Sequence, residues 1–393
     1  MIPLSAFFVS LATLLVVARK SLWIALWSSA LLLGAITLSP SALWRAVYGT
    51  LTDPAILMLA LAVAAIPMIG GIMEDSGMMD RLVNRLPANR RIFLLIAPSL
   101  VGLLPMPGGA LLSAPIIERG AGELSAEAKT AINVWFRHVL LLVYPLGALL
   151  ATTKMARVDL YTVILTLSPG FLLMFAAGTL FTLRNVHGSR LNTTCENAAI
   201  PLLVILLAPA LHFLLLRLFP GIIEEIPLLA GVSASLVLAL RAGRIAAGRI
   251  SAIARRMKPW SFALIILGMF LFLSTFTASE ASEMIARAAF SPTFTLVVMG
   301  GFLGFATGRV QVPVFIVLPI FIARFGPDAV TPLSFALLFF SAYQGYVISP
   351  VHPCLTVTLQ YYHADFKAVY RILLPPALLC WAAALVVCLG LLG

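Results

Sequence analysis

Charged residues are scarce in this sequence. Only 10% of its 393 residues are Asp, Glu, Lys or Arg, whereas 61% are hydrophobic. Soluble domains carry about 25% charged residues, so the composition excludes an ordinary soluble protein and favours a polytopic membrane protein. In such a protein the net charge of +11 reflects basic cytoplasmic loops rather than a nucleic-acid surface. We therefore expect the lipid bilayer as a partner, and no nucleic acid.

Acidic residues are missing from the middle of every long apolar segment. Those that come closest, Glu74, Asp75, Glu280 and Glu283, lie at segment ends. A membrane enzyme, for example one acting on lipid-linked phosphates, would need an acid–base or metal cluster such as paired carboxylates. The sequence shows no such cluster, so we predict that the chain is not an enzyme.

Cysteine is also sparse. The four cysteines, Cys195, Cys354, Cys380 and Cys388, show no CxxC spacing, the pattern that marks many metal and redox sites. We therefore predict no metal site, no disulfide framework and no cofactor. A secretory signal is not expected either, because no basic residue precedes the first apolar run, and we interpret 3–18 as the first span.

What the sequence does contain is an internal repeat. Prolines recur at a separation of about 205 residues, as in Pro107/Pro313 and Pro145/Pro350, and the apolar segments follow the same register. Recurrence of this kind indicates a tandem duplication. Paired apolar segments interrupted by Gly and Pro are typical of secondary transporters.

The duplication sets the predicted domain organisation. Repeat one covers 1–183, a linker covers 184–198 and repeat two covers 199–393. A transmembrane helix needs roughly 20 apolar residues. The expected apolar segments are 3–18, 21–38, 54–72, 92–118, 130–152 and 159–183, followed by 199–219, 226–241, 259–277, 293–324, 331–360 and 366–392.

The fourth apolar segment of each repeat is interrupted in its middle. Residues 92–118 contain Pro105-Met106-Pro107-Gly108-Gly109, through which a straight helix cannot pass. Each arm is too short to cross a bilayer at about 1.5 Å per residue. We predict a re-entrant helical hairpin over 92–118 and a second over 293–324, with its tip at 307–313. Two tilted, kinked spans are the alternative.

The hairpins determine the predicted orientation. If each returns to its own side, each repeat crosses an odd number of times and the second repeat is inverted. The fold class is then all-α, with two inverted repeats, about ten transmembrane helices and two re-entrant hairpins. The basic loops 81–91 and 241–258 share one face, which should be cytoplasmic. We expect a multi-pass protein of the cytoplasmic (inner) membrane with both termini extracytoplasmic.

Two arginines, Arg137 and Arg309, fall inside apolar segments, where a charge is costly and usually faces a cavity or a partner. His138 adjoins the first, and His352 lies in the break 349–353. With no acid at similar depth, the central charge is positive, so the sequence predicts an anionic substrate. A guanidinium fork matches carboxylate and phosphate groups.

Structural roles for the same residues stay open. Arg137 could pair with Glu118 or Glu123 near the cytoplasmic surface, and Arg309 could bond carbonyls freed by the break. His138 could be a hydrogen-bonded core residue and His352 a helix cap. The surrounding polar residues could simply satisfy one another.

The hairpin tips and broken helices complete the predicted site. Half-helix N-termini after Gly108-Gly109 and after Val312-Pro313 present free N–H groups and a positive dipole end. Prolines 145 and 350 free carbonyls that can coordinate Na⁺, and histidine can carry protons, so the coupling ion is expected to be Na⁺ or H⁺. The candidate substrate-binding residues are Pro105, Pro107, Gly108, Gly109, Asn133, Arg137, His138, Thr307, Gly308, Arg309, Gln311, Tyr343, Gln344, Ser349 and His352.

The run 104–110, Phe136-Arg137-His138 with Tyr144-Pro145, and the repetition of this layout resemble an uncharacterised prokaryotic membrane-protein family. That family is placed in the ion transporter superfamily with gluconate permeases and citrate and dicarboxylate transporters. The resemblance implies an elevator-type homodimer whose hairpin tips and broken helices hold the substrate. The sequence departs from the Na⁺/dicarboxylate members, because neither tip carries Ser-Asn-Thr.

These observations predict a secondary active transporter of a small organic anion, a carboxylate or sugar acid, coupled to Na⁺ or H⁺. The elevator mechanism implied by the resemblance would move a transport domain, 92–183 with 293–392, against a scaffold, 1–90 with 199–290. An anion channel or an exporter on the same scaffold is the alternative. A membrane-embedded enzyme is less favoured.

Overall fold

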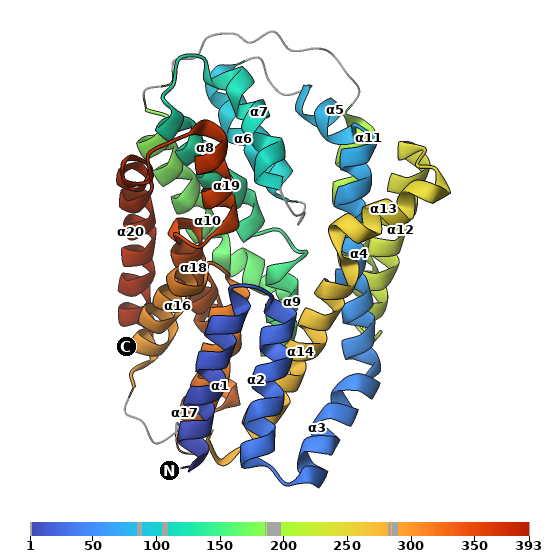
Figure 1. Ribbon diagram of the computed structural model, residues 1–393, viewed down its shortest axis with the longest axis vertical. Helices are drawn as coiled ribbons and strands as arrows, with labels where there is room; N and C mark the ends of the chain where they lie inside the picture. The colour runs from blue at the N-terminus through green and yellow to red at the C-terminus, as the bar shows by residue number, and fades with distance from the viewer. Residues whose placement is uncertain are drawn as a thin grey trace.

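The computed structural model describes residues 2–84, 89–103, 109–184, 186, 198–281, 284 and 290–392, and helices form the body of the molecule (Figure 1). The first half contains α1 (Ile2–Ala18), α2 (Leu22–Thr37), α3 (Pro40–Thr52), α4 (Pro54–Asp75), α5 (Met78–Asn84), α6 (Arg90–Gly102), α7 (Gly109–Ala121), α8 (Ala126–Val139), η1 (Leu140–Leu142), α9 (Ala148–Ala156) and α10 (Leu160–Thr182). The second half contains α11 (Ala199–Leu218), α12 (Glu225–Gly243), α13 (Ala247–Met257), α14 (Pro259–Ala278), the π-helical η2 (Phe294–Met299), α16 (Gly300–Thr307), α17 (Gln311–Phe325), η3 (Pro327–Ala329), α18 (Pro332–Ile348), α19 (Pro353–Tyr362) and α20 (Phe366–Leu391).

Capping side chains specify where several of the apolar helices begin. Asp53, Asn89, Asp159 and Asp365 each accept a hydrogen bond from backbone N–H groups in the first turn of α4, α6, α10 and α20. Thr331 forms a capping box at the start of α18. These side chains satisfy donors that the helix leaves unpaired, so the apolar segments start at residues that the sequence encodes locally.

Seven helical stretches among the described residues are long and apolar enough to cross a membrane. Large apolar side chains on their outer faces are exposed, as for Leu165 (72% exposed) and Val386 (68% exposed). Such faces fit lipid rather than water. In contrast, 83% of the apolar window in the stretch formed by α18 and α19 is buried inside the protein. The chain is therefore a helical multi-pass membrane protein with α18 near its centre, and the crossing count and the inversion stay predictions.

Both predicted hairpin segments are interrupted. We call the pair α6 and α7 hairpin one, and η2 with α16 and α17 hairpin two. Within each hairpin the arms pack on each other. α6 ends at Gly102 and α7 begins at Gly109, while α16 ends at Thr307 and α17 begins at Gln311. Figure 1 shows α6 and α7 towards the upper end of the molecule and α17 towards the lower end.

The predicted start of the second half-helix needs one correction. We expected α17 to begin after Val312-Pro313, but it begins at Gln311, with Pro313 in its first turn. Proline is tolerated there because the N–H groups of the first turn have no partner within the helix. The preceding reversal uses Gly308, whose φ of 61° favours glycine.

The long segments that follow the hairpins are also broken. Residues 143–147 separate η1 from α9, with Gly147 at φ 85°, and residues 349–352 separate α18 from α19. These are the positions of Tyr144-Pro145 and of the Ser349-Pro350 break expected from the sequence. Proline cannot continue the helical hydrogen-bond ladder, so the local sequence accounts for both interruptions.

Glycines bring each hairpin against the helix that follows it. A Cβ on Gly102 of α6 would lie 1.9 Å from the Arg137 carbonyl oxygen in α8, and a Cβ on Gly304 of α16 would lie 2.1 Å from the Ala342 carbonyl oxygen in α18. Only a residue without a side chain fits at these distances. The close approach places Gly102 of hairpin one beside the last turn of α8 and Gly304 of hairpin two beside α18.

The helices pack in two neighbourhoods. In the first, α14 contacts α2 and α4, and α4 contacts α12. α1 packs on α2, and α11 packs on α12. Hairpin one packs against α8, hairpin two against α18, and α10 and α20 lie beside both of those helices. α14 contacts α17 and α9 across the boundary. Scaffold and transport domains, and movement between them, stay predictions on this arrangement.

Candidate functional site

The two hairpins and both broken helices line one cavity of about 550 Å³. α8 contributes the two side chains at its end, Arg137 and His138, and Phe262 of α14 closes part of the wall. The predicted site residues that line the cavity are Gly109, Arg137, His138, Gly308, Arg309, Gln311, Tyr343 and His352. Residues from both halves of the chain therefore meet at one place, as the sequence pattern required.

Two other predicted residues support the cavity without lining it. Asn133 is buried, and its Nδ2 donates to the Ala110 carbonyl oxygen and to Thr358 Oγ1, both at 3.2 Å. Ser349 Oγ donates to the Phe305 carbonyl oxygen at 2.5 Å. The first bond holds hairpin one beside α8, and the second holds hairpin two beside the break after α18.

Two more of the predicted residues lie away from the cavity. Thr307 Oγ1 bonds back to the Leu303 carbonyl oxygen at 2.7 Å within its own helix. The buried Gln344 points its Nε2 towards the sulfur of Met174, at 3.9 Å. Thr307 and Gln344 therefore do not line the cavity. The predicted Pro105, Pro107 and Gly108 lie outside the described residues.

Arg137 holds the start of α7, the second arm of hairpin one. Its side chain is buried, and Nη1 donates to the Gly109 carbonyl oxygen at 2.8 Å and to Ser113 Oγ at 3.4 Å. The expected alternative, an ion pair with Glu118 or Glu123, is not found among the described residues, and Glu118 pairs with Lys129 at 2.7 Å. Arg137 lies too deep along α8 to reach the carboxylate at the surface end of α7. Its charge is therefore presented to the cavity.

Arg309 occupies the tip of hairpin two, directly after the left-handed Gly308. It is half-buried and lines the cavity. In the part of the chain that the structure describes, its guanidinium has no hydrogen-bond or ion-pair partner. Bonding of Arg309 to the carbonyls freed by the break, the expected alternative, is accordingly not observed among those residues. An unpaired guanidinium at a cavity wall is free to bind a ligand.

The charge of the cavity has one sign. Two guanidiniums lie in its lining, and no carboxylate is found among the described residues that form it. A buried charge is unfavourable unless it is paired. The arrangement is therefore suited to an anion, whose oxygens would accept hydrogen bonds from the Arg309 fork.

An aromatic cluster forms the opposite wall. Tyr343 donates to the His138 carbonyl oxygen at 2.8 Å, and the Tyr346 hydroxyl lies 3.1 Å from His138 Nε2. The rings of Tyr346 and His352 are 4.2 Å apart between centroids. At the register of about 205 residues, Tyr343 corresponds to His138. The two positions meet across the boundary between the repeats.

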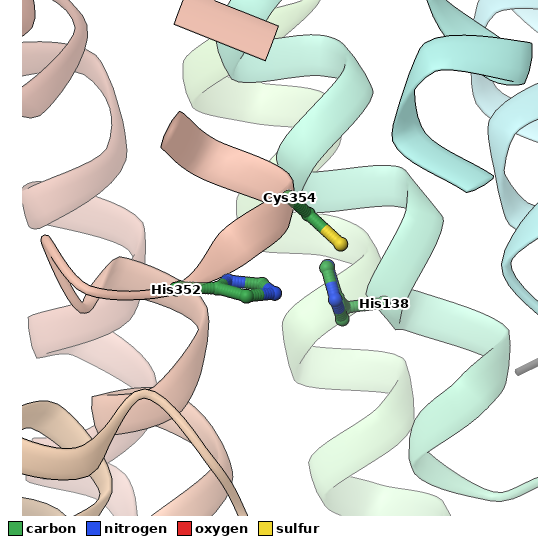
Figure 2. Close-up of side chains that lie close together, drawn as sticks. All are labelled: His138, His352 and Cys354. Atoms are coloured by element: carbon green, nitrogen blue, oxygen red, sulfur yellow. The ribbon is translucent and has the colours of Figure 1, made fainter. Parts of the chain in front are cut away.

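Cys354 is the functional candidate that the sequence reasoning missed. Its thiol projects towards the side chains of His138 and His352, as Figure 2 shows. A CxxC pattern does not mark this group, because its members come from α8, from the break after α18 and from the first turn of α19. The signal in the sequence is the position of Cys354, two residues after His352 and directly after the break.

These features define a class: a helical multi-pass membrane protein built around two interrupted hairpins that meet at a polar cavity. The chain belongs to the family described as "Protein of unknown function (DUF401)", which matches residues 4–391. A comparison with curated proteins finds no match.

Two solved structures share the fold. The YdaH transporter of Alcanivorax borkumensis superposes with a TM-score of 0.61 at 15% identity, over 93% of this chain and 96% of that one. MtrF of Neisseria gonorrhoeae superposes with a TM-score of 0.59 at 13% identity, over 100% of this chain and 96% of that one. The relation to gluconate permeases and citrate transporters that the sequence suggested is not seen in these comparisons.

Proposed function

We propose that this protein is a secondary active transporter of a small organic anion, a carboxylate or a sugar acid. The observation that carries the proposal is the cavity between the hairpins, lined by Arg137 and Arg309 and by no carboxylate among the described residues. Its volume of about 550 Å³ lies within the range of roughly 300–1,000 Å³ common for small-ligand sites. Both similar folds belong to proteins described as a transporter or an efflux pump.

The roles of the residues follow from their contacts. Arg309 binds the anion directly because its guanidinium is unpaired among the described residues. Arg137 adds positive charge and holds the first residue of α7 through Gly109. The N-termini of α7 and α17 add positive dipole ends at the same cavity.

Transport requires that the cavity open to each side in turn. In the proposed elevator mechanism, 92–183 with 293–392 moves against the scaffold of 1–90 with 199–290. The contacts of α14 with α17 and α9 are where the two parts slide. Carbonyls freed at Pro145 and Pro350 are the proposed ligands of a coupling Na⁺, and H⁺ is the alternative coupling ion. The resemblance favours a homodimer.

Export is the second candidate function. MtrF is described as illuminating a class of antimetabolite efflux pumps, and the present cavity has an aromatic wall of Phe339, Tyr343 and Tyr346. An aromatic carboxylate would use that wall and the arginines together. We propose export of such an anion as the alternative to uptake.

A two-stage experiment tests the proposal. The purified protein is first screened for thermal stabilisation by carboxylates, sugar acids, phosphate and sulfate, with and without Na⁺, since binding to the folded state stabilises by mass action. The stabilising anion is then followed in proteoliposomes under imposed Na⁺ and proton gradients. Saturable flux driven by one gradient supports the proposal, whereas unsaturable flux down the anion gradient alone indicates a channel. Absence of stabilisation by any anion would contradict the site.

A further inference from the structure

His138, His352 and Cys354 form a cluster whose ligand atoms all lie within 4.8 Å of one another. Figure 2 shows the three side chains directed towards a common point, with His138 from α8, His352 from the break after α18 and Cys354 from the first turn of α19. Ligands around one zinc ion lie about 3.5 Å apart, as bond lengths of about 2.0–2.3 Å in a tetrahedron require. Side-chain movements of about 1 Å would bring the three atoms to that separation.

In both histidines Nε2 is the ring nitrogen that could bind a metal. His138 Nδ1 lies 2.6 Å from the Val134 carbonyl oxygen, and His352 Nδ1 lies 3.4 Å from the Val347 carbonyl oxygen. A carbonyl only accepts hydrogen bonds, so both Nδ1 atoms carry the proton and both Nε2 atoms carry the lone pair. Backbone contacts of this kind commonly orient histidines that bind metals.

The Nε2 atom of His352 is buried without a hydrogen-bond partner in the described part of the fold. His352 is 1% exposed, and its Nε2 has no hydrogen-bond partner among the described residues. Leaving a buried acceptor without a partner is unfavourable. The third member, the Cys354 sulfur, lies within 4.8 Å of a ring nitrogen of each histidine, and a cysteine binds a metal as the thiolate.

We propose that these three residues bind a transition-metal ion of the zinc class. Two imidazoles and a thiolate are soft and borderline ligands that suit Zn²⁺ and do not suit Mg²⁺ or Ca²⁺. All three residues line the cavity, so the fourth coordination position faces it and can accept an oxygen of the bound anion. Sites with three protein ligands and one open position have this form.

The charges at the site couple the binding of the metal ion to the binding of the anion. The thiolate cancels one of the two charges of the ion, and Arg137 and Arg309 add two more positive charges in the same cavity. The ion therefore binds more tightly when an anion is present, and the anion more tightly when the ion is present. The metal site itself goes beyond the proposed transport, and it stands even if no organic anion is carried.

The test uses full-length protein in detergent, stripped of metal and titrated with Co²⁺, which reports thiolate ligation by a charge-transfer band in the near ultraviolet. We expect one equivalent to bind with that band, and Zn²⁺ to displace it. Cys354→Ser should abolish the band and weaken binding by more than about a hundredfold, because even residues that only orient a ligand change affinity by 10–100-fold. The matched control replaces Cys195, Cys380 and Cys388 together by Ser and should keep the band.

Tyr346→Phe is the discriminating variant. It removes the Tyr346 hydroxyl, which lies 3.1 Å from His138 Nε2 and competes with the ion for that nitrogen. We therefore expect metal affinity to rise about three- to tenfold. A purely structural aromatic cluster would not gain affinity for cobalt. The proposal is overturned if the wild type binds no Co²⁺ stoichiometrically, if the band survives in Cys354→Ser, or if Tyr346→Phe weakens binding. If Cys354→Ser does not fold, His352→Gln replaces it with the same expected loss.

Discussion

Hairpin one and hairpin two pack against the helix that follows each of them in the same way, but the side chains at the two contacts differ in charge. In both, a glycine lies against a backbone carbonyl of the following helix: Gly102 against Arg137 and Gly304 against Ala342. Arg137 and Ala342 correspond at the predicted register of about 205 residues. The backbone contact is therefore common to both repeats, while the side chain at the same position is a cation in one repeat and a methyl group in the other.

The second difference lies at the tips. The Arg137 guanidinium donates hydrogen bonds to hairpin one, at the Gly109 carbonyl oxygen and at Ser113 Oγ. Arg309, on hairpin two, has no such partner among the described residues. Arg137 is therefore a positioning residue for hairpin one, and we propose that Arg309 is mainly a ligand-binding residue, although both contribute positive charge to one cavity.

The largest expected effect comes from the contact that the hairpins share. Gly102→Leu and Gly304→Leu should each lower the free energy of unfolding by about 3 kcal/mol or more, because a backbone carbonyl cannot move aside for the added side chain. Thermal unfolding and gel filtration in detergent measure the loss. Gly49→Ala is the control, since a Cβ added at Gly49 would meet no atom within 4 Å. Normal stability of either leucine variant would contradict the docking geometry.

Arg137→Ala should show an effect of intermediate size on stability. It leaves the Gly109 carbonyl oxygen without its partner, a loss of about 1–3 kcal/mol, and it also weakens anion binding. Arg137→Lys keeps the charge but not the fork, so it should recover binding more than stability. Thermal shift with and without the stabilising anion separates the two effects. Equal stability of Arg137→Ala and wild type would remove the distinction between the two arginines.

Ser349→Ala tests the link between hairpin two and the break after α18. The Ser349 hydroxyl donates to the Phe305 carbonyl oxygen at 2.5 Å, and loss of one such bond costs about 1 kcal/mol. We expect a small fall in melting temperature and little change in anion affinity. A large loss of affinity with unchanged stability would instead place Ser349 at the ligand.

Glu118→Gln should have the smallest effect. Glu118 pairs with Lys129 in a half-exposed ion pair, and exposed pairs contribute about 0–1 kcal/mol. Both the melting temperature and the anion affinity should stay close to wild type. A clear fall in anion affinity would show that Arg137 depends on Glu118 after all.

The sequence predicted those parts of the fold that depend on local chemistry. Pro145 and Pro350 lie in interruptions because proline removes a backbone donor, and Asp53 marks a helix start by capping. The start of α17 was missed by three residues, because the first turn of a helix tolerates proline and Pro313 therefore did not have to precede it.

The cavity was only partly predictable for a different reason. The arginines and histidines were visible because charge is rare at membrane depth. Cys354 and Phe262 were not predicted, because the packing of helices distant in the sequence determines which residues line the same cavity. The partner of Arg137, the Gly109 carbonyl oxygen, was likewise not predicted, because it depends on depth along α7, which spacing in the sequence does not define.

The most direct test of the proposed site is an anion titration of Arg309→Ala beside wild type and Arg309→Lys, by calorimetry on folded protein in detergent. We predict that Arg309→Ala loses about a hundredfold in affinity, since a hydrogen-bonded charged group contributes about 1.5–3 kcal/mol. Its melting temperature without ligand should match wild type, and Arg309→Lys should fall between the two. Unchanged anion affinity in folded Arg309→Ala would contradict the central claim.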